Sequence, residues 1–252
     1  MYPEERRQAI ADLTRTERRV EVQGLASTLG VTPETIRRDL TELERAGILR
    51  RVHGGAIPAE RLREEPALGE KAQAMAAEKR RIAKVALEHV PAGGTVLLDA
   101  GTTTGELATL LPDHSLTVVT NSLPIASTLA SRDRLTVRVL GGRVRGRTMA
   151  DVGGWALRSL EELLVDVAFL ATNGLSVERG LSTHDPDEAE VKRAMVAAAR
   201  RRVLLADHTK VGQEHLIAYA PVREIELVIT DTGLEDEAAH RLAAAGPEVV
   251  RA

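Results

Sequence analysis

The sequence of 252 residues contains no cysteine, and aromatic side chains make up only 2% of it. The absence of cysteine excludes disulfide bonds, cysteine-based zinc sites and thiol catalysis. No apolar run approaches the roughly 18 residues that a membrane-spanning helix needs, and the charged first residues are unlike a signal peptide. We therefore expect a cytoplasmic protein with no membrane partner, whose core is filled by aliphatic side chains.

Total charge says little about the partners of this protein. The formal net charge is −3, and residues 1–58 carry ten arginines against nine acidic residues. The distribution is more informative, because arginines occur as the pairs Arg37-Arg38 and Arg50-Arg51, and paired cations can contact phosphates together. The arrangement of charge in this segment therefore favours a nucleic-acid partner.

Residues 1–58 show the pattern of a winged helix-turn-helix domain. Thr32 is a good N-cap residue, Pro33 suits the first helical position, and the preceding Gly30 suits the end of a helix. A three-residue turn between two helices is typical of a helix-turn-helix. The periodicity predicts helices over about 3–14 and 22–29, a third helix from Thr32, a strand over 48–52 and a tight turn over 53–55 that makes a two-stranded wing.

The third helix and the wing supply the candidate DNA-binding residues. In a helix-turn-helix the N-terminal half of the second helix of the pair enters the major groove, where arginine bonds guanine and threonine holds phosphates. An arginine pair alone is more typical of a solvated surface than of a DNA contact, and only the ordered combination of turn, cap, arginine pair and Gly-Gly turn favours DNA. The candidates are Thr32, Thr35, Arg37, Arg38, Arg50, Arg51 and His53.

The remaining sequence predicts a linker over 59–68 and a second domain over 69–252. A long helix is expected over 69–89, and with the linker it is the expected transmitter between the domains. Short apolar strands then alternate with amphipathic helices, which predicts an α/β domain with a mostly parallel sheet. The expected strands are 95–98, 116–120, 136–140, 167–171, 203–206 and 227–230, and the expected helices are 103–111, 123–131, 156–164 and 186–200.

Polar residues follow several of the expected strands. Ligands bind beyond the carboxyl ends of the strands in such sheets, and a Gly-Thr loop that opens a helix offers backbone N–H groups and hydroxyls to a phosphate. Each motif alone has a simpler explanation, such as an N-cap or a turn, but their combination indicates an effector site. The candidates are Asp99, Gly101, Thr102, Thr103, Thr104, Asn121, Gly142, Arg143, Asn173, Asp207 and Lys210.

Other conspicuous residues fit structural roles better. We interpret the single Trp155 as a packing residue, and the acidic residues at 187–190 as a solvated helix start. The seven histidines include no pair at metal-ligand spacing on an apolar helix face, so we expect no metal and no cofactor.

Two segments of the first domain resemble the DeoR family of bacterial transcriptional regulators. Residues 32–40 read Thr-Pro-Glu-Thr-Ile-Arg-Arg-Asp-Leu and residues 51–56 read Arg-Val-His-Gly-Gly-Ala, and both agree with the family almost residue for residue. The resemblance implies that Thr35 and the first arginine pair face duplex operator DNA. It also implies that Asp39 braces the arginines or a helix end.

The second domain resembles the sensor domain of the same family. The resemblance implies a fold similar to ribose-5-phosphate isomerase. It also implies that the sensor domain binds phosphorylated sugars as effectors without converting them, and it adds Lys192 to the candidate effector site. His184 stands where the family commonly has proline, and His208 where it commonly has serine, so the identity of the effector stays open. The matching segments are 99–103, 120–121, 141–142, 173–174, 180–183 and 188–192, with Asp207 and Lys210.

Within the family, four segments look most like fructose-operon repressors. That resemblance implies fructose 1-phosphate as the effector, with fructose 1,6-bisphosphate or another sugar phosphate as alternatives. The segments are 121–126, 141–148, 155–157 and 210–215.

Two function classes remain open: a repressor released from its operator by a sugar phosphate, and a sugar-phosphate isomerase with an appended DNA-binding domain. Isomerisation needs a positioned acid and base. No second carboxylate motif indicates catalysis, so we expect a repressor without enzyme activity. One helix-turn-helix covers only half an operator, so we also expect a homo-oligomer, a dimer or a tetramer.

Overall fold

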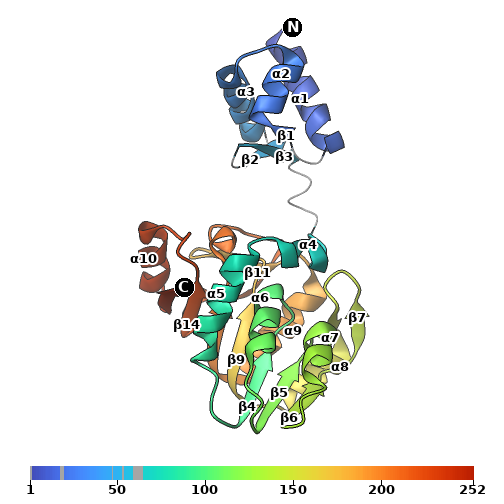
Figure 1. The fold of residues 1–252 in the computed structure, drawn as a ribbon, viewed down its shortest axis with the longest axis vertical. Helices are drawn as coiled ribbons and strands as arrows, with labels where there is room; N and C mark the ends of the chain where they lie inside the picture. The colour runs from blue at the N-terminus through green and yellow to red at the C-terminus, as the bar shows by residue number, and fades with distance from the viewer. Residues whose placement is uncertain (1, 18–19, 47, 53, 59–64) are drawn as a thin grey trace. The chain divides into compact units, whose positions relative to one another are not determined.

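The computed structural model describes residues 2–17, 20–46, 48–52, 54–58 and 65–252 (Figure 1). Contacts between Cα atoms divide the chain into two compact units, residues 1–65 and residues 66–252. His53, and residues 59–64 of the expected linker, lie outside the described residues. No helix in the described ranges is long and apolar enough to cross a membrane.

The first unit is a winged helix-turn-helix, as predicted. One small core joins its helices and strands, and the apolar face of α3 contributes Ile36, Leu40 and Leu43 to it. The wing has three strands in the order β1-β3-β2 rather than the two expected, because Val20 and Glu21 pair with β3. The elements are α1 (Pro3–Glu17), β1 (Val20–Glu21), α2 (Val22–Leu29), α3 (Pro33–Arg45), β2 (Leu49–Val52) and β3 (Gly55–Pro58).

Local chemistry fixes the turn between α2 and α3. Gly30 ends α2 in the left-handed conformation, with φ of 64° and ψ of 36°, which a residue without a Cβ adopts at little cost. Thr32 caps α3, because its hydroxyl oxygen accepts a hydrogen bond from the backbone N–H of Thr35 at 3.3 Å. The predicted cap and turn are therefore confirmed.

A buried ion pair connects α1 to α3. The guanidinium of Arg6 donates to Asp39 from Nε at 2.6 Å and from Nη2 at 3.3 Å, a two-point contact that fixes both side chains. This hydrogen bonding raises the pKa of Arg6 above its ordinary value. Asp39 does brace an arginine, but that arginine lies on α1 rather than in the pair on its own helix.

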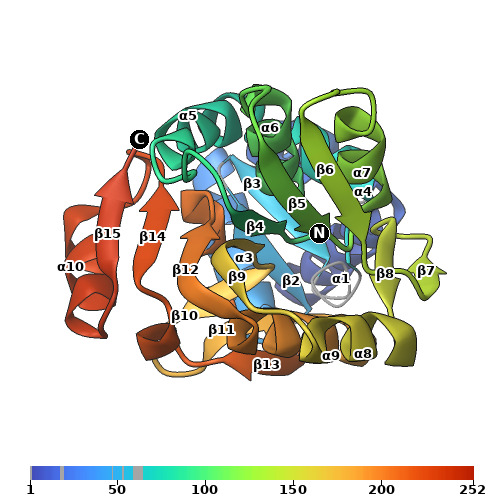
Figure 2. The same cartoon turned by 90° about the horizontal axis from the view of Figure 1, so that it is seen from below.

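The second unit is built on a seven-stranded sheet in which every neighbouring pair is parallel (Figure 2). The strand order is β15-β14-β12-β9-β4-β5-β6. The expectation of a mostly parallel α/β domain is therefore confirmed. The strands are β4 (Thr95–Leu98), β5 (Leu116–Thr120), β6 (Leu135–Val139), β9 (Val165–Ala171), β12 (Ala199–Leu205), β14 (Leu227–Thr230) and β15 (Glu248–Arg251).

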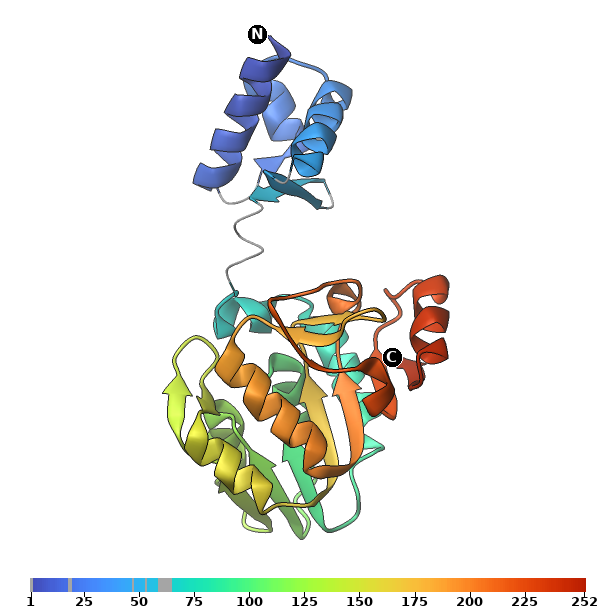
Figure 3. The same ribbon diagram turned by 180° about the vertical axis from the view of Figure 1, so that it is seen from behind.

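Helices cover both faces of this sheet. One apolar cluster packs α5, α6 and α7 against one face, and a second cluster packs α8, α9 and α10 against the other, where α8 and α9 lie across the sheet in Figure 3. The bounds are α5 (Ala76–Leu87), α6 (Thr102–Leu110), α7 (Leu123–Leu129), α8 (Gly154–Glu161), α9 (Pro186–Ala197) and α10 (Asp236–Ala244).

Smaller elements surround the carboxyl ends of the strands. A hairpin pairs β7 with β8, and a three-stranded antiparallel sheet has the order β10-β11-β13. The bounds are α4 (Leu68–Gln73), β7 (Arg143–Arg145), β8 (Ala150–Val152), β10 (Gly174–Ser176), β11 (Gly180–Thr183) and β13 (Ile217–Ala220), with 3-10 turns at His208–Lys210 and Val222–Glu224.

Two expectations about the second unit are wrong. The single helix over 69–89 is broken into α4 and α5, because Met75 takes a left-handed conformation with φ of 55°. Trp155 is not a packing residue, because 69% of it is exposed. The local sequence favoured a continuous helix in the first case, and the residue type favoured burial in the second. The tertiary structure decides otherwise in both cases.

We predict that Asp39→Asn lowers the free energy of unfolding of the first unit by about 1.5–3 kcal/mol, because Arg6 keeps its charge and loses its carboxylate partner. Hydrogen exchange of the amides in α1 and α3 measures this unit separately from the second. The matched control is Glu42→Gln, which removes an exposed ion pair with Arg45 and costs about 0.5 kcal/mol or less. Equal losses in both variants would show that the buried pair contributes no special stability.

Candidate functional site

The candidate site lies where the chain reverses its direction of travel across the sheet. From β4 the chain proceeds outward through β5 to β6, and it then returns to place β9 on the other side of β4. In open parallel sheets such a switch point leaves a crevice beyond the carboxyl ends of the two central strands. The residues that follow β4 and β9 therefore meet at this position.

The loop after β4 passes close to β9. A Cβ on Gly101 would lie 2.5 Å from the Cβ of Ala171, so only glycine fits here. Thr104 fixes the loop, because its hydroxyl donates to the backbone carbonyls of Asp99 at 2.7 Å and Gly101 at 3.0 Å. α6 begins at Thr102, and its first backbone N–H groups have no acceptor within the helix. The loop thus presents hydrogen-bond donors to the crevice.

A pocket with a cavity volume of about 50 Å³ occupies this crevice. Its walls come from α4, the start of α5, the loop after β4, α9 and the segments after β9 and β12. It is lined by Leu68, Lys71, Lys79, Ala100, Gly101, Thr102, Thr103, Thr148, Ala171, Thr172, Asn173, Glu188, Lys192, Leu205, Asp207 and Lys210.

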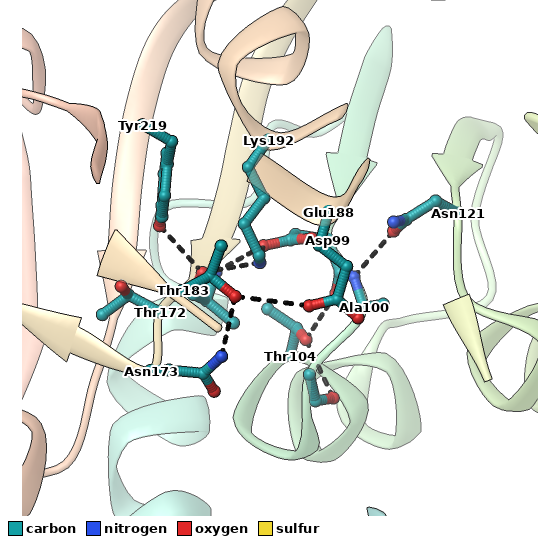
Figure 4. A network of polar contacts seen from close by, with 12 residues as sticks. Asp99, Ala100, Thr104, Asn121, Thr172, Asn173, Thr183, Glu188, Lys192 and Tyr219 are labelled. Carbon is teal, nitrogen blue, oxygen red and sulfur yellow. Dashed lines mark hydrogen bonds and ion pairs between the residues drawn. The ribbon is translucent and has the colours of Figure 1, made fainter. Parts of the chain in front are cut away.

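A buried ion pair between Asp99 and Lys192 forms the floor beneath the pocket (Figure 4). Oδ2 of Asp99 also accepts from the backbone N–H of Ala171 at 3.0 Å, while Nζ of Lys192 donates to the carbonyl of the same residue at 2.9 Å. Burial lowers the pKa of Lys192, but the charges of Asp99, Tyr219 and Glu188, together with the hydrogen bond to Asp99, outweigh burial and raise that pKa above its usual value. The ammonium of Lys192 is therefore charged at neutral pH.

Tyr219 closes one side of this floor. Burial raises the pKa of Tyr219 to about 12, so its hydroxyl stays protonated and donates to the carbonyl of Ala171 at 3.1 Å. Nζ of Lys192 lies 5.7 Å from the centre of the Tyr219 ring, within range of a cation–π interaction.

Glu188 is an engaged carboxylate at the wall of the pocket. Its Oε1 accepts from Arg145 at 3.1 Å and from the hydroxyl of Thr148, and its Oε2 accepts from Thr183 at 3.4 Å. The hydroxyl of Thr183 in turn accepts from the side-chain amide of Asn173 at 2.9 Å (Figure 4). This chain of contacts orients Asn173 at the mouth.

The structure brings most of the sequence-predicted effector residues to one place, but in different roles. Gly101, Thr102, Thr103, Asn173, Lys192, Asp207 and Lys210 line the pocket. Asp99, Thr104 and Asn121 support it from beneath, and the side chain of Asn121 accepts from the backbone N–H of Ala100 at 2.7 Å.

Gly142 and Arg143 lie outside the pocket. Arg143 belongs to β7 and pairs with Asp187, and the side chain is 61% exposed. Gly142 has a φ of 116° and packs close to the backbone of Val152. Both residues do follow a strand of the sheet, β6, as the rule for ligand sites requires. The β7–β8 hairpin that they lead into nevertheless lies outside the pocket.

Sequence reasoning missed Lys71, Lys79 and Thr148 as lining residues. Lys71 and Lys79 lie in the region expected to be one continuous helix, and only the break at Met75 places them at the pocket. No glycine, proline or other local sequence pattern at Met75 indicates that the helix breaks there. The interpretation of the acidic residues at 187–190 as a solvated helix start is wrong for Glu188. This residue is buried and lines the pocket.

A second concave surface gathers the candidate DNA-binding residues of the first unit. Arg37 pairs with Glu34 at 3.0 Å, and Nη1 of Arg51 donates to the hydroxyl of Thr41 at 3.0 Å. The side chain of Arg50 and all of His53 lie outside the part of the chain that can be described. The surface is lined by Thr32, Glu34, Thr35, Arg37, Arg38, Thr41, Glu42, Arg45 and Arg51.

Comparisons with known proteins agree with this two-unit arrangement. Residues 6–61 match the family described as "DeoR-like helix-turn-helix domain", and residues 74–232 match "DeoR C terminal sensor domain". Among solved structures, ribose 5-phosphate isomerase A from Methanocaldococcus jannaschii is 16% identical, with 55% of each chain covered and a TM-score of 0.41.

Two relatives match along almost their whole length. The "HTH-type transcriptional regulator GlpR" of Haloferax volcanii is 40% identical over 99% of this chain and 98% of its own. The "HTH-type transcriptional repressor GlcR" of Bacillus subtilis is 32% identical over 92% of this chain and 89% of its own. The chain therefore belongs to the DeoR family of DNA-binding transcriptional repressors.

Proposed function

We propose that this repressor is released from its operator when a phosphorylated sugar binds the pocket at the switch point between β4 and β9. The balance of charge in the pocket carries this proposal. The charges of Lys192 and Glu188 are compensated by Asp99 and Arg145. The lysines that line the pocket, Lys71, Lys79, Lys192 and Lys210, outnumber its two lining carboxylates, Glu188 and Asp207, and this excess of positive charge favours an anion.

The phosphate of the effector occupies the loop that opens α6. The N–H groups of residues 102–104 and the hydroxyls of Thr102 and Thr103 supply its donors. Asn173 and Asp207, at the ends of β9 and β12, bond the sugar hydroxyls. A sugar phosphate has this combination of one strong anion and several neutral hydroxyl groups.

The sugar is bound without being converted. A general base needs a carboxylate that can reach the substrate. Asp99 is fully buried beneath the pocket, Glu188 already accepts from three side chains, and Asp207 accepts from the N–H and the hydroxyl of Thr209. Asp99 and Glu188 are thus engaged in supporting the walls, and only Asp207, whose Oδ1 is held by Thr209, has an oxygen left for the sugar. The pocket therefore offers no second carboxylate for the proton transfers of isomerisation. The relatives named above, which are transcriptional regulators by name, are consistent with binding alone.

In the DNA-bound form, α3 lies in the major groove of the operator and Arg51 of the wing contacts the backbone. Arg38 is exposed and makes no hydrogen bond or ion pair with any described residue, so its guanidinium is available to a base edge. Two copies of the chain bind the two halves of the operator.

We predict that Arg38→Ala weakens specific binding about 10- to 100-fold, because one bidentate base contact contributes about 1–3 kcal/mol. Arg51→Ala weakens binding to all sequences and lowers the salt slope by about one. The measurement is a salt series on random DNA and on an operator selected from a random pool. The exposed Arg241→Ala, on α10, is the charge-matched control. If neither variant differs from this control, α3 and the wing are not the DNA surface.

Variants of the pocket should repress permanently. Thr103→Val and Lys210→Ala remove donors to the phosphate, and we expect operator binding to persist while release by the sugar phosphate is lost. Lys84→Ala, an exposed lysine on α5, is the control. The readout is fluorescence anisotropy of labelled operator during titration with the sugar. A folded Lys210→Ala variant that no longer binds operator would contradict the proposed direction of regulation.

Fructose 1-phosphate is the effector that we favour, on the strength of the resemblance to fructose-operon repressors. Calorimetric titration with fructose 1-phosphate, fructose 1,6-bisphosphate, glycerol 3-phosphate and pentose phosphates tests this choice. We expect fructose 1-phosphate to bind most tightly and to be recovered unchanged. Tighter binding of a triose or pentose phosphate refutes the choice, and turnover of any of these sugars refutes the proposal that the site only binds.

A further inference from the structure

We propose that Thr41 and Glu44 of α3 are positioning residues that hold Arg51 of the wing ready to contact the DNA backbone. The proposal rests on the proposed function, because it takes α3 and the wing to be the DNA surface. It adds two residues that no sequence motif indicated, and it assigns neither of them a contact with DNA. α3 then has a second task besides reading bases, which is to orient the wing.

The backbone of Arg51 is fixed by Glu44. Arg51 belongs to β2, which lies at one edge of the wing in the order β1-β3-β2 and pairs with β3. A strand at the edge of a sheet has backbone N–H groups that no neighbouring strand can accept. The N–H of Arg51 donates to Oε1 of Glu44 at 2.8 Å. This carboxylate thus takes the place of a neighbouring strand and holds β2 against α3.

The side chain of Arg51 is held one helical turn away from Glu44. Nη1 of Arg51 donates to the hydroxyl oxygen of Thr41 at 3.0 Å. That oxygen acts as the acceptor because the hydroxyl donates its own hydrogen to the backbone carbonyl of Arg37 at 2.9 Å. Arg51 is therefore bound to α3 at two points, through its backbone and through its guanidinium.

The contact with Thr41 still allows Arg51 to bind a phosphate. A guanidinium has five N–H donors in a rigid fork, and Thr41 takes one of them. Arg51 is exposed and lines the same concave surface as Arg38, which is the residue proposed to read a base. A phosphate of the DNA backbone can therefore be bound while the contact with α3 persists.

The benefit of this arrangement is a smaller entropic cost of binding. A long side chain that is mobile in the free protein loses its freedom when it binds DNA, whereas one that is held in advance has already lost it. The wing does not depend on these two bonds for its attachment, because Leu43 of α3 and Leu49 of β2 share one apolar core. We therefore expect Thr41 and Glu44 to affect DNA binding more than folding.

Thr41→Val tests the contact with the guanidinium, because valine keeps the shape of threonine without its hydroxyl. We expect the full-length protein to bind the selected operator and random duplex DNA about two- to tenfold more weakly, as the cost of ordering one long side chain implies. The salt slope should not change, because Arg51 still reaches its phosphate. In the Arg51→Ala background the same substitution should have no further effect. The measurement is fluorescence anisotropy of labelled DNA over a salt series.

Thr16→Val is the matched control for this variant. Thr16 is exposed on α1, and its hydroxyl donates to the backbone carbonyl of Asp12, four residues earlier, at 3.0 Å. It therefore makes the same bond to its own helix as Thr41 does, but it lies outside the concave surface. Hydrogen exchange of the amides of α3 checks that each variant is folded.

Two variants of Glu44 separate the hydrogen-bond acceptor from the charge. Glu44→Gln removes the negative charge and keeps a side-chain oxygen for the N–H of Arg51, whereas Glu44→Ala removes both. The two variants have the same net charge, so the electrostatic repulsion from DNA is the same in both. We expect Glu44→Ala to bind DNA about two- to tenfold more weakly than Glu44→Gln, which corresponds to the net contribution of one hydrogen bond.

The outcomes distinguish this inference from the proposed function. If Arg51→Ala weakens DNA binding but Thr41→Val binds like Thr16→Val, the role of Thr41 is refuted and the DNA surface stands. A loss in Thr41→Val that persists in the Arg51→Ala background means that Thr41 acts on DNA directly, which also refutes positioning. Equal binding by the two Glu44 variants refutes the role of Glu44. If Arg51→Ala binds DNA as tightly as Arg241→Ala, the wing is not part of the DNA surface, and the proposed contact of Arg51 is refuted together with this inference.

Discussion

The second unit depends on one interaction, the buried ion pair between Asp99 and Lys192. Asp99 directly follows β4 and Lys192 lies on α9, so the pair joins the end of a central strand to a helix that covers one face of the sheet. Both partners also bond the backbone of Ala171 at the end of β9. Two charges can be buried here only because each compensates the other, and loss of one would leave the other uncompensated in the interior. The pair therefore fixes the crevice in which the remaining lysines gather.

The same pair supports the proposal that the crevice binds its ligand without converting it. An aspartate at the carboxyl end of a central strand is a natural position for a catalytic base, but Oδ2 of Asp99 is already engaged with Lys192 and Ala171. Its Oδ1 is buried and has no hydrogen-bond partner among the described residues. Asp99 is not among the residues that line the pocket, so its carboxylate supports the crevice from beneath. Under this proposal, the lysines that line the pocket attract an anion and perform no chemistry on it.

The fold could be predicted from the sequence where local chemistry and tertiary structure agree. The Gly30 turn and the Thr32 cap determine their own conformations, and continuous apolar strands identify a sheet that is covered on both faces. The break at Met75 could not be predicted, because residues 69–89 suit a helix throughout. The contacts that hold α4 as a separate helix, such as those of Leu68 to Arg147 and of Lys71 to Asn173, join segments that lie far apart in the sequence. Trp155 was misinterpreted because burial depends on where a helix lies, which residue type does not reveal.

The candidate site was predictable in position and less so in detail. The rule that ligands bind at strand ends led to Asp99, Asn173 and Asp207, which follow adjacent strands. It could not separate Thr103, which lines the pocket, from Thr104, whose hydroxyl donates to backbone carbonyls of the loop itself. It also included Arg143, which the β7–β8 hairpin turns outward to Asp187. These distinctions depend on side-chain direction, which the order of residues does not determine.

A crystal structure of the full chain with a phosphorylated sugar bound is the most direct test of the central claim that this crevice is the effector site. The account predicts that the phosphate lies within hydrogen-bond distance of the N–H groups of residues 102–104 and of Nζ of Lys210, with the sugar hydroxyls toward Asn173 and Asp207. A sugar phosphate found elsewhere, with this crevice empty, would contradict it.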